Sequence, residues 1–175
     1  MPTNTTDFYL GNPNLKKVGA EIQFTKEQIS EYLKCKEDPV YFAMNYIKII
    51  SLDEGIVPFK MWDFQQELIR NFHENRFNIA KLPRQTGKST TCVSYLLHYV
   101  LFNDNVNVGI LANKLSTARD LLGRLQLAYE QLPMWMQQGI ITYNKGSMEL
   151  ENGSKILAAS TSASAVRGMS FNILF

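Results

Sequence analysis

One stretch decides the fold: Leu82-Pro83-Arg84-Gln85-Thr86-Gly87-Lys88-Ser89-Thr90. The apolar segment that leads into it, residues 77–82, is typical of a short strand, and a long helical pattern follows it. A loop that enters a helix N-terminus turns backbone N–H groups toward an anion. Here Gly87 lets the backbone approach a phosphate, Lys88 supplies a positive charge and Ser89 offers a hydroxyl to Mg²⁺. We therefore predict a site for a nucleoside triphosphate and its Mg²⁺.

The stretch departs from the usual phosphate-loop pattern G-x-x-x-x-G-K-[ST], since Leu82 stands where the first glycine belongs. A chance Gly-Lys-Ser tripeptide at a helix start is the alternative interpretation. The expected strand before the loop, the apolar-faced helix after it and a second strand behind that helix favour a phosphate loop. Arg84 and Gln85 are expected near the γ-phosphate, with solvated loop residues as the alternative.

Hydrophobic periodicity predicts helices before and after the loop. They are expected over residues 26–36, 39–47, 61–74, 88–102 and 116–129, the last capped by Ser116. Strands are expected over residues 77–82, 106–112, 140–143, 147–150 and 155–158. Asn152-Gly153 is typical of the hairpin turn between the last two. Strands that alternate with helices indicate an α/β fold with parallel crossovers and a helical N-terminal preface.

Composition excludes several classes of protein. The 175 residues are 45% hydrophobic and 19% charged, which is ordinary for a soluble globular chain and unlike a disordered one. The formal charge of +2 is too small to indicate nucleic acid binding by itself. Two cysteines without C-x-x-C spacing predict free thiols and no zinc site. With neither a signal peptide nor an apolar run of membrane-spanning length, we expect a soluble intracellular protein.

Other residues with useful chemistry favour ordinary roles. Trp62 and Trp135 are interpreted as packing groups in preference to platforms for base stacking. Lys114, Arg119 and Arg124 follow the second strand, and contact with a DNA backbone or a solvated basic face are equally consistent with them.

The loop resembles the variant Walker A motif of the large terminase subunit of tailed phages, in which an Arg-Gln pair replaces the usual small residues. Other segments resemble successive parts of the same family, in the same order. They are residues 11–16 (GNPNLK), 38–43 (DPVYFA), 64–65 (FQ), 109–114 (GILANK), 144–147 (NKGS) and 165–168 (AVRG). The resemblance extends from about residue 11 to the end and is strongest to contractile-tailed phages.

This resemblance implies a DNA-packaging motor with ATP and Mg²⁺ as cofactors. Its fold would be a P-loop NTPase of the RecA-like, additional-strand, catalytic-glutamate type, with a parallel sheet that is incomplete at the C-terminus. The expected partners are double-stranded DNA, the portal protein, the small terminase subunit and further copies in a ring, and no membrane. The expected location is the host cytoplasm, transiently on the prohead and not in the mature virion.

The resemblance also assigns roles to residues. Lys88 and Ser89 match the Walker A lysine and magnesium ligand, and Arg84 matches an arginine that senses or stabilises the γ-phosphate in cis. Gln65 matches a glutamine like that of the helicase Q motif, which reads the adenine edge; a solvated helix residue is the alternative. Arg167 matches an arginine that reaches a neighbouring subunit's nucleotide, with a structural role as the alternative. The full set of expected nucleotide contacts is Gln65, Arg84, Gln85, Thr86, Gly87, Lys88, Ser89 and Thr90.

Residues 171–175 resemble the Walker B strand up to the point where its Asp and the catalytic Glu belong. We therefore expect the N-terminal piece of a longer ATPase and nuclease, able to bind nucleotide with almost no catalysis by itself. We divide it into a flexible arm (1–22), a helical segment (23–76) and a partial phosphate-loop ATPase core (77–175). A superfamily-2-like helicase core, and a catalytically inactive nucleotide-binding fragment that needs a partner in trans, stay open as alternatives.

Overall fold

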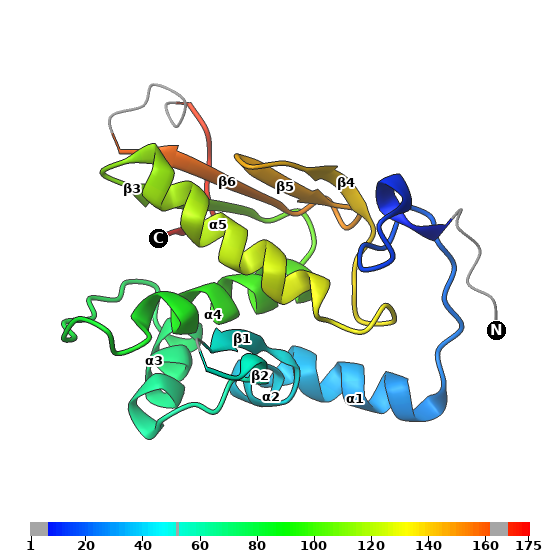
Figure 1. The fold of residues 1–175 in the computed structure, drawn as a ribbon, viewed down its shortest axis with the longest axis horizontal. Coiled ribbons are helices and arrows are strands. Elements are labelled where there is room, and N and C mark those ends of the chain that lie inside the picture. The colour runs from blue at the N-terminus through cyan, green and yellow to red at the C-terminus, as the bar shows by residue number, and fades with distance from the viewer. Residues whose placement is uncertain (1–6, 52, 162–167) are drawn as a thin grey trace.

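The structure, a computed structural model, describes residues 7–51, 53–161 and 168–175. Its helices are a short 3₁₀ turn (Tyr9–Gly11), α1 (Lys26–Glu37), α2 (Pro39–Tyr46), α3 (Asp63–Glu74), α4 (Lys88–Phe102) and α5 (Leu115–Glu130). Its strands are β1 (Lys48–Ser51), β2 (Gly55–Pro58), β3 (Asn107–Ala112), β4 (Ile140–Tyr143), β5 (Ser147–Leu150), β6 (Lys155–Ser160) and β7 (Ile173–Leu174). Figure 1 shows the main sheet above α5 and α4, with α1, α2 and α3 below α4.

The main sheet is mixed, with strand order β4-β5-β6-β3-β7. β6, β3 and β7 are parallel, whereas β4, β5 and β6 are antiparallel. The hairpin predicted at Asn152-Gly153 is confirmed between β5 and β6, where Gly153 takes a φ of +79°. The predicted α/β class is therefore confirmed, and the parallel part of the sheet is its β6-β3-β7 half.

Local sequence signals explain where several helices begin. Thr25 and Gln28 form a capping box at the start of α1, and the Asp38 carboxylate caps α2 with Pro39 at its first position. The predicted cap of α5 is wrong: the N-cap is Lys114, and Ser116 lies inside the helix. The chain turns directly from β3 into α5, which starts the helix at Leu115.

The expected strand over residues 77–82 is wrong, since the structure has no regular element there. A strand forms when a neighbour completes its hydrogen-bond ladder and its apolar face is covered. Neither condition holds: the described sheets do not include residues 77–82, and the side chains of Phe77 and Ile79 are 84% and 100% exposed. A cavity of about 700 Å³ lies beside this segment, between it, α3, α4 and residues 171–175.

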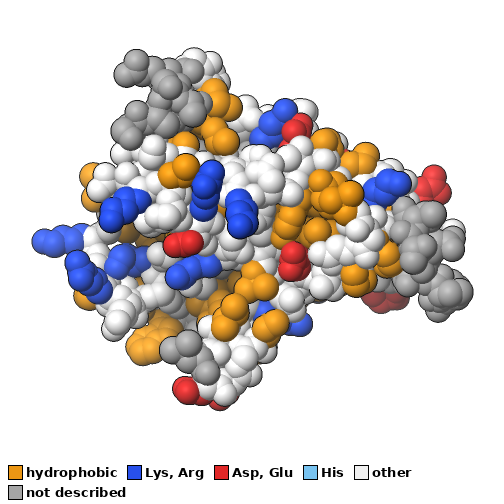
Figure 2. All heavy atoms as spheres, turned by 45° about the horizontal axis from the view of Figure 1, so that its top comes forward, with side chains coloured by type: hydrophobic (Ala, Val, Ile, Leu, Met, Phe, Trp, Pro, Cys, Tyr) orange, Lys and Arg blue, Asp and Glu red, His pale blue; other side chains and the backbone are white. Residues whose placement is uncertain are grey.

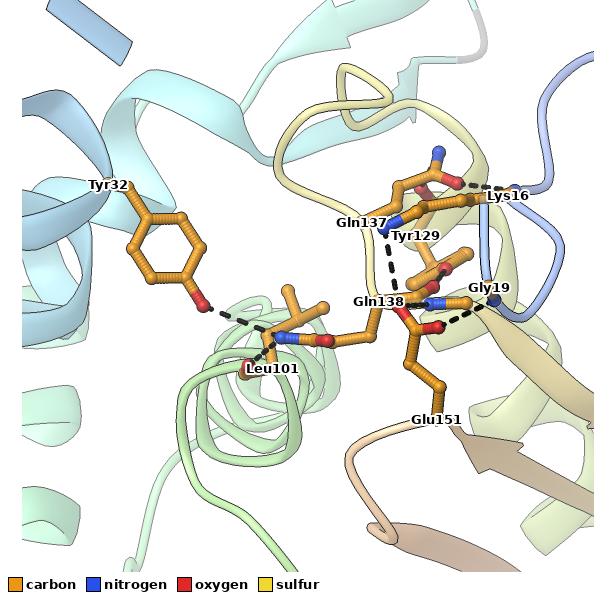
Figure 3. A network of polar contacts seen from close by, with 9 residues as sticks. Lys16, Gly19, Tyr32, Leu101, Tyr129, Gln137, Gln138 and Glu151 are labelled. Atoms are coloured by element: carbon orange, nitrogen blue, oxygen red, sulfur yellow. Dashed lines mark hydrogen bonds and ion pairs between the residues drawn. The ribbon is translucent and has the colours of Figure 1, made fainter. Parts of the chain in front are cut away.

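Residues 7–19, part of the segment predicted to be a flexible arm, are packed against β4 and the β5–β6 turn (Figure 3). The Glu151 carboxylate accepts hydrogen bonds from the backbone of Gly139 at 2.7 Å and of Gly19 at 3.1 Å, and pairs with Lys16 Nζ at 3.2 Å. Gln137, which is buried, accepts from the Lys16 N–H at 3.0 Å. Two polar side chains therefore hold the chain near residues 16–19 in place.

The structure adds a two-stranded hairpin, β1-β2, that the sequence did not predict. It pairs Ile50 with Ile56, and both side chains are exposed. Among the described residues, no helix combines the length and the apolar character that crossing a membrane requires.

Helix α4 is the centre of the core, because most of its side chains are buried between α5 on one side and α2 and α3 on the other. His98, inside this helix, replaces a missing backbone donor. The Cys35 carbonyl near the end of α1 would normally accept from residue 39, but Pro39 has no N–H. His98 Nε2 donates to that carbonyl at 2.8 Å, which leaves Nδ1 as the bare nitrogen, buried without a partner. Burial lowers the pKa of His98 to about 4.

This buried neutral histidine predicts acid-sensitive stability. The unfolded chain takes up the proton at an ordinary pKa near 6.5, whereas folded His98 resists it down to about 4. The free energy of unfolding is therefore expected to fall as the pH is lowered from about 6.5 to about 4, by up to about 3 kcal/mol. Urea unfolding across this pH range measures it. The variant His98→Phe is expected to show a smaller slope, and an identical slope in that variant would contradict the assignment.

Candidate nucleotide-binding site

The predicted phosphate loop leads directly into α4, whose first residue is Lys88. Gly87 is the N-cap, and its φ of 73° and ψ of 14° lie in the left-handed region. Gln85 is also left-handed, with a φ of 63°. Two such residues within three positions turn the chain sharply before the helix. Gly87 supplies no side-chain cap, so the N–H groups of the first turn of α4 meet no capping side chain.

The Lys88 ammonium lies inside the loop. Its Nζ donates to the carbonyl oxygen of Leu82 at 3.2 Å and to that of Pro83. The Thr86 hydroxyl donates to the Pro83 carbonyl at 3.0 Å, so the loop closes on itself around the lysine. An ammonium has three donors, and two are used here. The positive charge is thus held beside the helix N-terminus, with one donor left.

Ser89 and Thr90 occupy the first turn of α4 and are partly buried. Ser89 and Lys88 line the 700 Å³ cavity described above. The described residues contain no cluster of three or more His, Cys, Asp or Glu side chains placed to hold a metal ion. Among the described residues at the start of α4, the Ser89 hydroxyl is an oxygen ligand available to Mg²⁺, and phosphate oxygens and water are common further ligands of Mg²⁺ beside nucleotides. This donor set fits a Mg²⁺–triphosphate.

Gln65 belongs to α3, and its side chain contacts the phosphate loop. Its side chain is 4% exposed, its Oε1 accepts from the Trp62 N–H at 3.0 Å, and its Nε2 donates to the Thr86 carbonyl at 3.1 Å. The carboxamide therefore joins the start of α3 to the phosphate loop. A Cβ added to Gly87 would lie 2.6 Å from Gln65 Nε2, so the amide is packed directly on the glycine.

Three other residues were expected at the site: Arg84, Gln85 and Arg167. Arg84 and Gln85 are exposed on the loop. Arg167 lies outside the described residues. The structure thus brings Gln65 to the loop residues and leaves the predicted roles of the two arginines untested.

Trp62 is the residue whose setting the sequence did not indicate. Its indole is 71% exposed at the N-cap of α3, in edge contact with Phe64 at 6.3 Å between ring centroids, so the expected packing role is wrong. Trp135, by contrast, packs edge-on against Tyr46 at 5.9 Å as expected. Trp62 is the N-cap of α3, three residues before Gln65, and its exposure depends on which segments pack beside the helix start.

One turn into α4, Cys92 lines the cavity as a neutral thiol. Burial raises its pKa to about 12, while the nearby Lys88 charge opposes that rise. Three basic side chains lie on the molecular surface away from the cavity lining: Lys114, the N-cap of α5, and Arg119 and Arg124 within α5 are exposed. Figure 2 shows Lys and Arg side chains gathered toward one side of the face it draws, with few acidic ones among them.

The left-handed Gly87 generates a test of the loop. Gly87→Ala places a side chain in a disfavoured backbone region and against Gln65, and we expect it to lower the free energy of unfolding by about 1–2 kcal/mol. Gly123→Ala is the matched control, because a Cβ at that helical position in α5 meets nothing within 4 Å. The control is expected to stabilise by about 0.5–1 kcal/mol. Urea unfolding measures both, and a neutral Gly87→Ala would contradict the geometry.

Two comparisons with known proteins bear on the family and the fold of the chain. The family model "Terminase large subunit, T4likevirus-type, N-terminal" matches residues 79–175, more than half of the chain. The structure of the HK97 bacteriophage large terminase is similar in fold, with a TM-score of 0.64 and 16% sequence identity over 79% of this chain. The chain spans 30% of the length of that terminase. The chain belongs to the N-terminal part of the terminase large subunit family, T4-like type, whose members are components of DNA-packaging motors.

Proposed function

We propose that this chain is the nucleotide-binding part of a phage DNA-packaging motor and that it binds ATP with Mg²⁺ at the start of α4. The observation that carries the proposal is the junction at Gly87 and Lys88, where a left-handed glycine leads straight into a buried helix with an uncapped first turn. The family match to the terminase large subunit supports the motor assignment.

Each loop residue has a role in this proposal. The first-turn N–H groups of α4 and the Lys88 ammonium bind the β- and γ-phosphates, with the helix dipole favouring the negative charge. The Ser89 hydroxyl is a ligand of Mg²⁺. Thr86 and Thr90 flank these contacts. Arg84 is exposed beside them, and it stabilises charge on the γ-phosphate during hydrolysis.

The remaining activities belong to the whole terminase. In the proposed motor, ATP hydrolysis moves double-stranded DNA into the prohead, and a nuclease cuts the concatemer. The proposed partners are the portal protein, the small terminase subunit and further copies in a ring, in the host cytoplasm and transiently on the prohead. Arg84 in cis and Arg167 across subunits are the two candidates for the arginine that acts on the γ-phosphate.

Lys88→Ala tests the site. Because Lys88 supplies the charge nearest the uncapped helix turn, its loss is expected to weaken Mg²⁺–ATP binding to this chain by about 100-fold or more. Titration calorimetry measures the affinity. Lys81→Ala, which removes an exposed lysine just before the loop, is the matched control and is expected to leave the affinity within about twofold. Unchanged affinity in Lys88→Ala would contradict the proposed function.

A further inference from the structure

We propose that the free edge of β1 is a docking site for an extended acidic segment of a partner protein, which adds to the β1–β2 hairpin as a third strand. The site is a groove of about 300 Å³ between the hairpin, α4 and α5. It shares no lining residue with the 700 Å³ cavity beside the phosphate loop, so docking here is a function separate from nucleotide binding.

The lining shows that the groove follows the edge of a strand. Four consecutive residues of one hairpin arm line it, Ile47, Lys48, Ile49 and Ile50, whereas β2, which is described in full, contributes none. Successive side chains of a strand point to opposite faces, so a pocket on one face of the hairpin would be lined by alternate residues. Four in a row indicate that the groove runs along the backbone of β1, on the side away from β2.

Backbone groups of β1 point into this groove without a partner. The Phe59 N–H donates to the Ile47 carbonyl at 2.9 Å, which makes these two residues a hydrogen-bonded pair of the antiparallel ladder. Since bonded and non-bonded pairs alternate, the N–H and C=O groups of Lys48 and Ile50 point away from β2. Pro58, which lies opposite Lys48 and has no N–H, agrees with this alternation. Among the described residues, neither Lys48 nor Ile50 makes a backbone hydrogen bond outside the hairpin.

An added strand would satisfy these groups and cover apolar surface. The hairpin is a sheet of its own, apart from the five-stranded sheet (Figure 1), and a two-stranded sheet gains stability from a third strand. The Ile50 side chain is 64% exposed at the edge. The opposite wall of the groove is apolar, with Val93 from α4 and Leu127 from α5. An open edge beside an apolar wall is the geometry by which proteins bind extended peptides.

Charge favours an acidic segment. Lys48 and Arg124 are exposed and line the groove, and no Asp or Glu is among the described residues that line it. Neither basic side chain forms an ion pair with a described residue. Carboxylates on an added strand would pair with both, and a guanidinium can hold a carboxylate by two N–H groups. A peptide fits better than a nucleic acid, because the open edge offers C=O acceptors as well as N–H donors, and phosphates accept only.

A charge reversal tests the site. The probe is the peptide Glu-Val-Glu-Val-Glu with a fluorescent label at its N-terminus and an amide at its C-terminus, and fluorescence anisotropy measures its Kd. Arg124→Glu is expected to raise Kd by about tenfold or more. Arg119→Glu is the matched control, because it makes the same change at an exposed position of α5 that does not line the groove. The control is expected to leave Kd within about twofold.

Methylation of the peptide backbone tests the addition of a strand. Only alternate amides of an added strand face β1. Two further peptides are therefore compared, one N-methylated at both Val residues and the other at the second and third Glu residues. One of the two is expected to bind about tenfold more weakly than the parent peptide, and the other to stay within about threefold of it. Equal affinities of the two methylated peptides would overturn strand addition.

The other outcomes are equally decisive. A parent peptide that does not bind at about 1 mM would overturn the proposal. Equal weakening by Arg119→Glu and Arg124→Glu would also overturn it, because attraction to the surface in general would then explain the binding. A duplex oligonucleotide that binds in place of the peptide, with the same dependence on Arg124, would assign the groove to nucleic acid. None of these results bears on Mg²⁺–ATP binding, which Lys88→Ala tests independently.

Discussion

The site depends on one contact between two helices: the Gln65 carboxamide at the start of α3 holds the Thr86 carbonyl, 21 residues away, just before α4 begins. This bond fixes a peptide next to the left-handed Gly87 and the direction in which the loop enters the helix. Lys88 follows at once, and its ammonium is held by two carbonyls of the loop. One buried amide and one ammonium therefore hold the same loop from two sides.

The rest of the fold keeps α4 in place. The helix is buried between α5 and the pair α2 and α3, and α5 in turn covers β3 and β6 (Figure 1). His98 ties α4 to the end of α1 by supplying the donor that Pro39 lacks. Glu151 and Gln137 hold the N-terminal segment beside β4, at the edge of the sheet. A helix held on several sides presents its N-terminus in one direction, as an anion site requires.

Local patterns predicted the elements whose causes are local. The capping box at Thr25, the Asp38-Pro39 start of α2 and the Asn152-Gly153 turn each act over four residues or fewer, and the structure has all three. Local patterns could not predict contacts between segments that are far apart in the sequence. The Gln65 bond to Thr86, the exposure of Trp62 and the absence of a strand at residues 77–82 all depend on which neighbours lie alongside, and periodicity carries no information on that. The family resemblance pointed to Gln65, and the structure shows what its amide contacts.

A crystal structure of this chain with Mg²⁺ and a non-hydrolysable ATP analogue tests the central claim most directly. The account predicts phosphates at the first turn of α4, in contact with Lys88 Nζ, with Mg²⁺ on the Ser89 hydroxyl. A triphosphate bound away from the first turn of α4, or out of reach of Lys88 Nζ, would contradict it.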